Sequence, residues 1–361
     1  MCNTHNYLNN IDSYFMDTSK AFNINHYIYY RLKEEKGIEK SSWPLGVGLK
    51  ISDKCNFNCS YCFTKKTNNF MSLNKIKHLT NALDQKPYQI YLTGGEPLLN
   101  PEFFEIVDHI HNLRIDTSIH TSGVIDDNLL SKMVSCANKL KRIQISIDSI
   151  KNFSDLRPTK IANPLKSIVN FIDVINNPDK IHVNCVVSSL NIECVKDIFS
   201  FCVDNNVKFL RLSTIFTTDE KLKVTDINVL PRVSEYIDMA RKYNIVLTMN
   251  PLCHPWSLKT SLGFSENSQL YCPAQKTEIE VDVNGNVYPC PFLHDDVHCM
   301  GNIFEQKIGD IWESGVDELK KLSWSDNKRC KICINYETCG GGCYANAYVH
   351  AQNYDPRCCL T

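Results

Sequence analysis

The stretch Cys55–Phe63, CNFNCSYCF, decides how the rest of the chain is interpreted, because it holds three cysteines at the spacing C-x3-C-x2-C. Three thiolates on one short loop, those of Cys55, Cys59 and Cys62, can hold three irons of a four-iron, four-sulfur cluster. No fourth cysteine follows at close range, so one iron is left open for another molecule. An open coordination position is typical of a catalytic centre, because a structural centre fills its own shell. The alternatives are a zinc knuckle or three free thiols in the core.

The loop resembles the signature of radical S-adenosylmethionine enzymes, C-x3-C-x-aromatic-C, with Tyr61 as the aromatic residue. In that family the amino and carboxylate groups of S-adenosylmethionine occupy the open iron. Reduction of the cluster then breaks the sulfonium and yields a 5′-deoxyadenosyl radical, which takes a hydrogen atom from the substrate. The cofactor carries this chemistry and the protein positions it. The resemblance therefore implies that Cys55, Cys59 and Cys62 are the catalytic cluster ligands.

Length, charge and cysteine content limit the class of protein. With 361 residues the chain suits one large domain and a smaller one. A formal net charge of -1, without any basic run, disfavours a nucleic-acid partner. No apolar run could span a bilayer and the N-terminus lacks a secretory pattern, so we expect a cytoplasmic protein with no membrane partner. The 18 cysteines are clustered, which in such a protein indicates metal ligands rather than disulfides.

Strand and helix patterns alternate after Pro44. Strands are predicted at residues 45–52, 88–93, 115–121, 142–147, 181–187 and 207–213, and helices at 71–83, 101–112, 126–137, 164–175 and 192–205. Near-continuous apolar strands between helices predict an α/β fold with a parallel sheet covered by helices. Six such units are too few for an eightfold barrel. They agree with the partial (β/α)6 TIM-like barrel that the resemblance implies, whose site lies at the C-terminal ends of the strands.

These patterns divide the chain into four expected parts. They are an N-terminal segment, 1–44, with a short helix near Tyr27–Glu35; the barrel core, 45–215; a less regular connecting region, 216–270, with a helix near Pro231–Tyr243; and a cysteine-rich domain, 271–361. In the last part, Asn284-Gly285 predicts a β-hairpin of residues 277–283 and 286–288, followed by a helix near Ile308–Leu322. The first 44 residues are too few for the separate peptide-recognition domain that many peptide-modifying members of the family carry.

The turn Gly94-Gly95-Glu96-Pro97 follows the predicted strand 88–93 directly. Two glycines let the backbone approach a ligand closely, and Glu96 can accept a charge-assisted hydrogen bond from an ammonium group. By itself this could be a plain glycine-rich turn. The family resemblance assigns it to the amino group of S-adenosylmethionine.

Weaker matches to the family complete the expected cofactor site. The residues are Tyr61 and Phe63 beside the adenine, Ser122 in HTSG, Ser146 in SIDS, Arg157 opposite the cofactor carboxylate, and Asn191. A bidentate guanidinium suits the task given to Arg157. Ser149 replaces the glycine that the family has in S-x-D-G. The alternatives are a strand-end hydroxyl for Ser146 and a surface charge for Arg157.

The C-terminal cysteines have the spacing C-x12-G-x4-C, then C-x2-C-x5-C-x3-C, then C. This resembles the seven-cysteine SPASM extension of radical S-adenosylmethionine enzymes, which holds two auxiliary four-iron clusters. The resemblance assigns the outer cluster to Cys330, Cys333, Cys339 and Cys358, and the inner cluster to Cys272, Cys290 and Cys343, with Cys253 or an open iron in fourth place. Cys359 is an alternative to Cys358, and Cys299 is expected to be structural. Structural zinc is the alternative for the whole set.

Radical and auxiliary clusters in one chain suit a net oxidation, because an auxiliary cluster can take the electron left after hydrogen abstraction. The resemblance points to peptide and protein substrates. The first hypothesis is therefore a radical SAM/SPASM maturase that installs an oxidative crosslink or another side-chain modification in a ribosomally made precursor peptide. Its expected cofactors are S-adenosylmethionine and three [4Fe-4S] clusters, and its expected electron donor is of the flavodoxin or ferredoxin type.

Three other functions stay open. An anaerobic sulfatase maturase would form formylglycine, but Pro291 stands where that family has its aspartate base, and His294, Asp295 or Asp296 would have to substitute. A small-molecule radical SAM dehydrogenase is a second alternative. A non-catalytic iron–sulfur or zinc scaffold is the third, and the turn with Glu96 beside an open three-cysteine loop argues against it.

Overall fold

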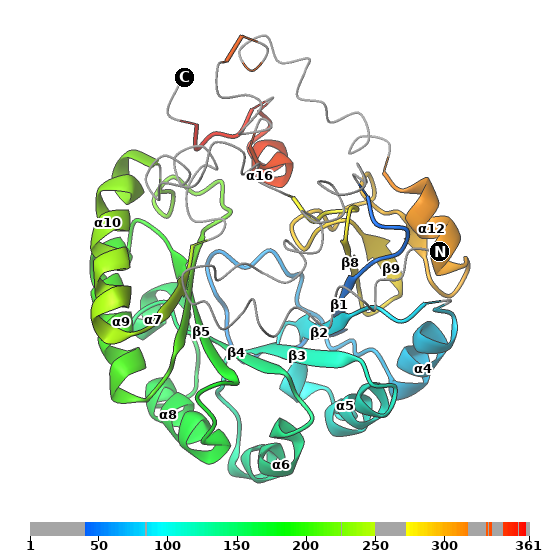
Figure 1. Ribbon diagram of the computed structural model, residues 1–361, viewed down its shortest axis with the longest axis horizontal. Helices are drawn as coiled ribbons and strands as arrows, with labels where there is room; N and C mark the ends of the chain where they lie inside the picture. Colours follow the sequence, from blue (N-terminus) through cyan, green and yellow to red (C-terminus); the bar gives the residue numbers. More distant parts are fainter. Residues whose placement is uncertain are drawn as a thin grey trace.

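A strongly curved sheet with helices around its outer side makes up the fold (Figure 1). The computed structural model describes residues 40–83, 85–224, 226–249, 272–316, 330, 332–333, 342–352 and 354–358. The expected helix near Tyr27–Glu35 lies outside these residues, as do Cys253, Cys339 and Cys359. The division of the chain at residues 44, 215 and 270 stays a prediction.

Ten strands of the described residues form one sheet in the order β10-β9-β8-β1-β2-β3-β4-β5-β6-β7. Their bounds are β1 Gly46–Ser52, β2 Gln89–Gly94, β3 Asp116–Thr121, β4 Arg142–Ser146, β5 Ile181–Val187, β6 Phe209–Thr214, β7 Val246–Thr248, β8 Glu278–Val281, β9 Asn286–Tyr288 and β10 Gly301–Asn302. Neighbours from β8 through β1 to β7 pair in parallel. β9 pairs antiparallel with β8 and β10. The six expected core strands are present in the expected order, which confirms the partial barrel.

Helices cover the outer face of the curved sheet (Figure 1). They are α4 (Leu73–Asn81), α5 (Phe103–Asn112), α6 (Asp127–Ala137), α8 (Pro164–Ile175), α9 (Val195–Asp204) and α10 (Asp226–Tyr243). Successive residues of a strand point to opposite faces, so Val47, Leu49 and Ile51 of β1 are fully buried in the core on one face. Gly48 and Lys50 between them point to the other face, the interior of the barrel.

The structure differs from the sequence expectation at three places. The connecting region contains a seventh parallel strand, β7, whose three residues are too few for a periodic signal. A one-turn helix, α7 (Phe153–Leu156), follows β4. The C-terminal hairpin joins the barrel sheet, because β8 pairs in parallel with β1. The cysteine-rich part is therefore attached to the strand that carries the cluster loop.

The remaining helices lie near the open side of the barrel. α12 (Ile308–Ser314) is shorter than the expected helix, and its Trp312 is buried with the indole N–H donating to the Ser41 carbonyl at 3.0 Å. α16 (Tyr344–Val349) lies between the ends of α10 and β8 in the view of Figure 1.

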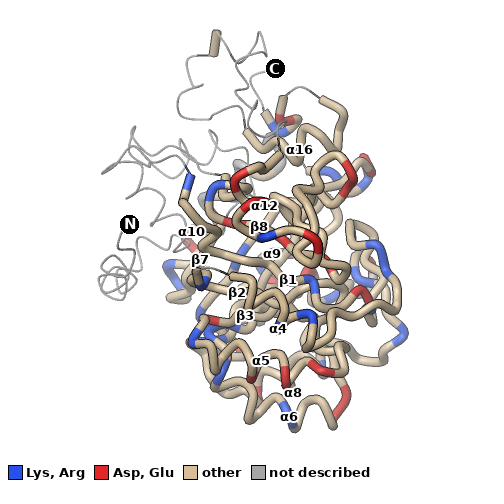
Figure 2. The backbone as a smooth tube through the Cα atoms, turned by 90° about the vertical axis from the view of Figure 1, so that its right-hand side faces the viewer, with Lys and Arg blue, Asp and Glu red and all other residues tan. Residues whose placement is uncertain are grey.

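Within the described ranges, no helix has the length and apolar character of a membrane span. Figure 2 shows cationic and anionic residues interspersed along the chain.

Candidate active site

The cluster loop leaves β1 at its C-terminal end and is held by the segment after β4. The Asn58 N–H donates to the Pro158 carbonyl at 2.8 Å, and the Ser60 N–H donates to the Leu156 carbonyl at 3.2 Å. The Thr159 hydroxyl donates to the carbonyl of Asn56 at 2.9 Å. These contacts give the three-cysteine loop a defined shape.

The three loop cysteines have the chemistry that an iron–sulfur cluster needs. Cys55 and Cys59 are half-buried and Cys62 is exposed. Burial raises the pKa of Cys55 to about 11 and also raises the pKa of Cys59, so iron has to displace a proton from each thiol on binding. In the part of the chain that is described, no three His, Cys, Asp or Glu side chains gather around a single-ion site. A four-iron cluster does not require this, since each cysteine binds a separate iron.

The two glycines of the Gly94-Gly95 turn are required by the protein's own backbone. A Cβ at Gly94, which has φ +133°, would lie 2.1 Å from the Ser52 carbonyl oxygen, and a Cβ at Gly95 would lie 2.4 Å from that of Lys54. The Gly95 N–H donates to the Ser52 carbonyl at 2.6 Å. These glycines were expected to let the backbone approach a ligand closely, whereas the close approach in the structure is between this turn and the start of the cluster loop.

Glu96 is 1% exposed and its carboxylate is held from the end of β3. Its oxygens accept hydrogen bonds from the Thr121 hydroxyl at 2.7 Å, the Ser122 N–H at 2.8 Å and the Ser122 hydroxyl at 2.7 Å. Burial raises the pKa of Glu96, against the opposing effect of these hydrogen bonds. The Glu96 carboxylate also raises the pKa of Cys55, so the two lie near each other. Ser122, expected at the cofactor, thus orients the carboxylate expected to bind it, and Pro97 begins the short 3-10 helix η2 (Pro97–Leu99) that follows.

Asp148 is a buried carboxylate for which the sequence predicted no role. It contacts two of the expected cofactor residues, Tyr61 and Arg157. The Tyr61 hydroxyl donates to Asp148, and the Arg157 Nη1 lies 3.5 Å from its Oδ2. The guanidinium lies over the Phe57 ring, 5.0 Å from the centroid. It lowers the pKa of Cys59, which places it beside the cluster loop. In the described part the buried Arg157 Nε has no hydrogen-bond partner, so a free donor remains there for an anionic group such as a carboxylate.

The other expected cofactor residues are placed less directly. The Asn191 amide already donates to the Asp148 carbonyl at 2.7 Å and to the Val186 carbonyl at 2.9 Å. Ser146 ends β4 opposite Asn184 of β5. Phe63 is 55% exposed and packs on Phe292, with ring centroids 4.9 Å apart. Cofactor roles for these residues stay predictions.

Three C-terminal cysteines that the resemblance assigns to the inner cluster act on one another electrostatically. Burial raises the pKa of Cys290, and the thiols of Cys272 and Cys343 also raise it, so the three lie in one region of the structure. Their role as ligands of the inner cluster stays a prediction. The Cys343 N–H donates to Asp355 at 2.8 Å. For the outer cluster, the described residues show the Cys333 N–H donating to the Cys330 carbonyl at 3.1 Å, and the Cys358 N–H donating to the Asp355 carbonyl at 3.0 Å.

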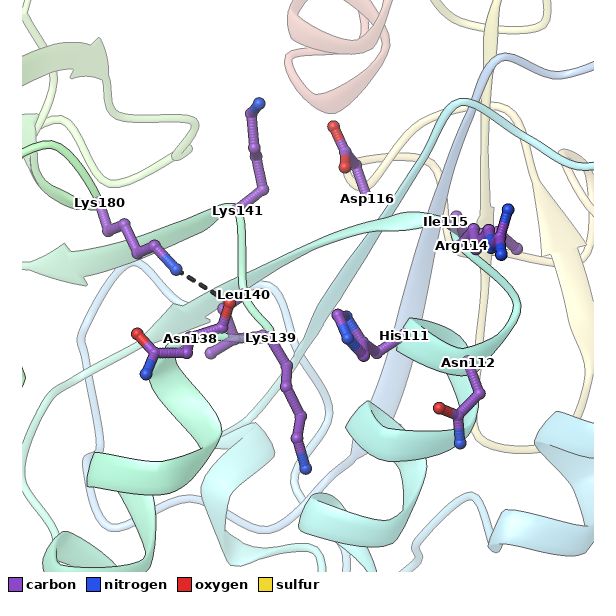
Figure 3. A pocket seen from close by; sticks show the side chains of 10 residues that line it. All are labelled: His111, Asn112, Arg114, Ile115, Asp116, Asn138, Lys139, Leu140, Lys141 and Lys180. Atoms are coloured by element: carbon purple, nitrogen blue, oxygen red, sulfur yellow. Dashed lines mark hydrogen bonds between the residues drawn. The ribbon is translucent and has the colours of Figure 1, made fainter.

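A surface depression of about 640 Å³ lies away from these residues. Figure 3 shows that it is lined by residues that precede β3, β4 and β5, among them Lys139 and Lys180. The Lys180 ammonium donates to the carbonyls of Ala137 and Asn138 at 2.9 and 3.1 Å, where it stabilises the C-terminal end of α6. This depression is at the N-terminal ends of the strands, opposite the cluster loop.

Comparison with known families agrees with this geometry. Residues 49–202 match the radical SAM superfamily, and residues 272–340 match the SPASM family, an iron–sulfur cluster-binding domain. The chain belongs to the radical SAM superfamily and carries a SPASM domain. It is therefore an enzyme whose cofactors are S-adenosylmethionine, a [4Fe-4S] cluster and auxiliary iron–sulfur clusters, as the sequence predicted.

Three relatives illustrate the range of this superfamily. The chain is 30% identical over 211 residues to a probable GTP 3′,8-cyclase of Methanocaldococcus jannaschii, covering 56% of this chain and 68% of that one. It is 22% identical over 330 residues to the mycofactocin maturase MftC of Mycobacterium ulcerans, covering 87% and 88%. SuiB of Streptococcus suis, solved with bound precursor peptide SuiA, shares the fold with a TM-score of 0.71 at 22% identity, covering 92% of this chain and 78% of that one.

Proposed function

We propose that this enzyme removes a hydrogen atom from a ribosomally made peptide and installs an oxidative crosslink or another side-chain modification. One observation carries the proposal: Cys290, a ligand expected for the inner auxiliary cluster, acts electrostatically on Tyr91 of the barrel interior. Burial and the nearby carboxylates of Glu278 and Glu280 raise the pKa of Tyr91 on β2, and the Cys290 thiol raises it further. An electron acceptor beside the space in which a substrate radical forms suits a net oxidation.

The residues around the cluster loop have separate tasks in this proposal. Bound S-adenosylmethionine, with a reduced cluster, supplies the group that abstracts hydrogen. Glu96 would accept a hydrogen bond from the cofactor's ammonium group, and Arg157 would pair with its carboxylate through the Nε, which has no partner in the described residues. Tyr61 and Asp148 hold the loop and the guanidinium in place.

Two relatives support a peptide as the substrate. MftC is named as a maturase, and SuiB was solved with a precursor peptide. We propose a flavodoxin- or ferredoxin-type protein as the electron donor, since the cluster has to be reduced in each turnover.

The side chains that would have to replace the aspartate missing at Pro291 argue against sulfatase maturation. Asp295 is engaged with the buried His298, whose Nδ1 lies 2.7 Å from its Oδ1. Burial lowers the pKa of His294 to about 4, and its ring stacks on Tyr288 with centroids 4.3 Å apart. Asp296 is exposed.

The test is anaerobic reconstitution followed by assays of cofactor cleavage and of peptides. About twelve irons and twelve sulfides per chain, without zinc, are expected for three four-iron clusters. Synthetic peptides encoded beside the gene are then incubated with enzyme, S-adenosylmethionine and dithionite. A peptide that raises 5′-deoxyadenosine formation and loses two hydrogen atoms in mass supports the proposal. Cofactor cleavage that no such peptide stimulates, with all peptide masses unchanged, contradicts it.

A further inference from the structure

Strand β8 brings a carboxylate into the interior of the barrel. Glu280 lies opposite Gly48 of β1, Gly48 lies opposite Tyr91 of β2, and Tyr91 lies opposite Ser118 of β3. Residues directly opposite on neighbouring strands share a face of the sheet. These four residues therefore form one row across four strands.

This row faces the interior rather than the helices. Arg211 of β6 has a pKa that burial lowers and that Glu278 and Tyr91 raise, so its guanidinium lies near both groups. Strands β2 and β6 are separated by three others in the sheet. Their side chains can meet only across the concave side of the sheet. Glu280 is on the same face as Tyr91 and so points into this space.

Gly48 makes room for the Glu280 side chain. A Cβ at Gly48 would lie 2.1 Å from the Oε2 of Glu280, much closer than van der Waals contact. A larger residue at this position would push the carboxylate away from β1. The missing side chain thus determines where the carboxylate lies.

Glu280 is a mostly buried carboxylate for which the described residues provide no hydrogen-bond partner. It is 6% exposed, and within the described residues its carboxylate makes no hydrogen bond or ion pair. Glu278, two residues earlier on the same face, is hydrogen-bonded to the Tyr91 hydroxyl. The Ser118 hydroxyl in the Glu280 row is also buried with no partner in the described part. Buried polar groups are normally paired because burying them unpaired is costly, so the unpaired Ser118 hydroxyl in one row with the Glu280 carboxylate indicates a place for a ligand.

The row lies between the two cluster sites. The cluster loop begins at the C-terminal end of β1, beyond Gly48, whereas Glu280 raises the pKa of Cys290 and so lies near that thiol. A substrate held in the barrel between the radical site and the inner auxiliary cluster would therefore meet the Glu280 carboxylate.

We propose, building on the proposed peptide modification, that Glu280 is the catalytic base that accepts the proton lost by the substrate. A substrate carbon first loses a hydrogen atom to the radical from S-adenosylmethionine. When the carbon radical bonds to an O–H, N–H or S–H group, one proton and one electron must leave. The proton goes to the Glu280 carboxylate, which becomes a carboxylic acid. The electron reduces an auxiliary iron–sulfur cluster, which passes it to an external acceptor protein.

The surroundings of Glu280 suit this task. Burial and the nearby Glu278 carboxylate together raise its pKa to about 8, against the opposing effect of Lys50. The elements beside Glu280 carry two further titratable groups, Tyr91 on β2 and Tyr288 on β9. Tyr288 lies directly opposite Glu280 in the antiparallel pair of β8 and β9. A base is most effective when its pKa is near the working pH.

The test compares the holoenzyme with three variants, using the peptide that reacts in the assay described above. Glu280→Gln is expected to form 5′-deoxyadenosine but to lose product by about 10²–10⁴-fold, and Glu280→Asp to restore part of it. Glu305→Gln, the same change at an exposed residue of the C-terminal part, is expected to keep the wild-type ratio of product to 5′-deoxyadenosine. In the wild type this ratio rises as the pH passes about 8; in Glu280→Gln it is independent of pH. A wild-type ratio in Glu280→Gln would overturn the proposal.

A second measurement needs no peptide and so separates this proposal from the proposed function. Infrared difference spectra of the cluster-loaded wild type, titrated from about pH 6 to 10, are expected to show a carboxylic acid band with a midpoint near 8. This band is expected to be missing in Glu280→Gln and displaced in Gly48→Ala, whose Cβ pushes the carboxylate away. If the two spectra of wild type and Glu280→Gln are identical, the buried, proton-accepting carboxyl group does not exist and the proposal fails.

Discussion

Replacing Asp148 by asparagine should weaken the contacts between the cluster loop and the barrel, because Asp148 binds both Tyr61 of the loop and the Arg157 guanidinium. The Asp148 and Arg157 side chains are 1% and 7% exposed, and the guanidinium lies 3.5 Å from the carboxylate. The Val186 N–H donates to Asp148 Oδ1 at 2.8 Å, and the amide oxygen of asparagine can keep that bond. The negative charge is lost, so the buried guanidinium has no counter-charge. Breaking one partner of a buried pair costs about 3–5 kcal/mol.

The matched control is Asp179→Asn, which removes the partner of Lys208 at the surface. The two side chains are 75% and 48% exposed with an N–O distance of 2.8 Å, and such pairs contribute about 0–1 kcal/mol. We expect the apparent unfolding temperature of reconstituted Asp148→Asn, measured at one scan rate, to fall by roughly 5–10 °C. The control should change little. 5′-Deoxyadenosine formation should fall only in Asp148→Asn. Equal unfolding temperatures and equal cofactor cleavage in the two variants would refute the reasoning.

Three further changes test the site. Gly94→Ala should lower the stability of the folded protein by about 2–4 kcal/mol, because it combines a strained positive φ with loss of the hydrogen bond from the Gly95 N–H to Ser52. Iron content and 5′-deoxyadenosine formation should both fall, and wild-type values of both would contradict the prediction. Cys59→Ala should abolish 5′-deoxyadenosine formation, and cleavage at the wild-type rate would show that the radical site is elsewhere. Cys333→Ala should lose about four irons and all product while keeping some cofactor cleavage. Full product without the outer cluster would rule out an essential redox role for that cluster.

Much of the barrel could be predicted because its signals are local. The predicted bounds of α8 and β5 agree with the structure residue for residue. Pro164 supplies the preset φ of a first helical residue, and Asn176 ends the helix in the left-handed region with φ 45°. The cluster loop and the turn with Glu96 were found for a similar reason, since each is a short motif directly after a strand.

The sequence could not show which distant residues meet. Asp148 is one residue of SIDS. Its role depends on its contacts with the Tyr61 phenol and the Arg157 guanidinium, which belong to other segments of the chain. Asn284-Gly285 predicted a hairpin strand over residues 277–283, and the alternation of a strand puts Glu278 and Glu280 on one face. Whether that face points to solvent or into the barrel depends on the parallel pairing of β8 with β1, which are more than 200 residues apart in the chain. No turn or spacing in the sequence specifies this pairing.

The pairing of β8 with β1 also gives a physical reason for a rigid distance between the cluster loop and Cys290, the two sites where we expect clusters. The N–H groups of Leu45 and Gly46 both donate to the Thr277 carbonyl, at 2.7 and 3.0 Å. β1 then runs to the cluster loop, while β8 leads through the hairpin to Cys290. Ladder hydrogen bonds thus connect both cluster sites to one strand, and on the other side the Phe63 ring of the loop packs on Phe292. A flexible linker would let the distance for electron transfer vary, whereas a shared strand holds it constant while substrate occupies the space between.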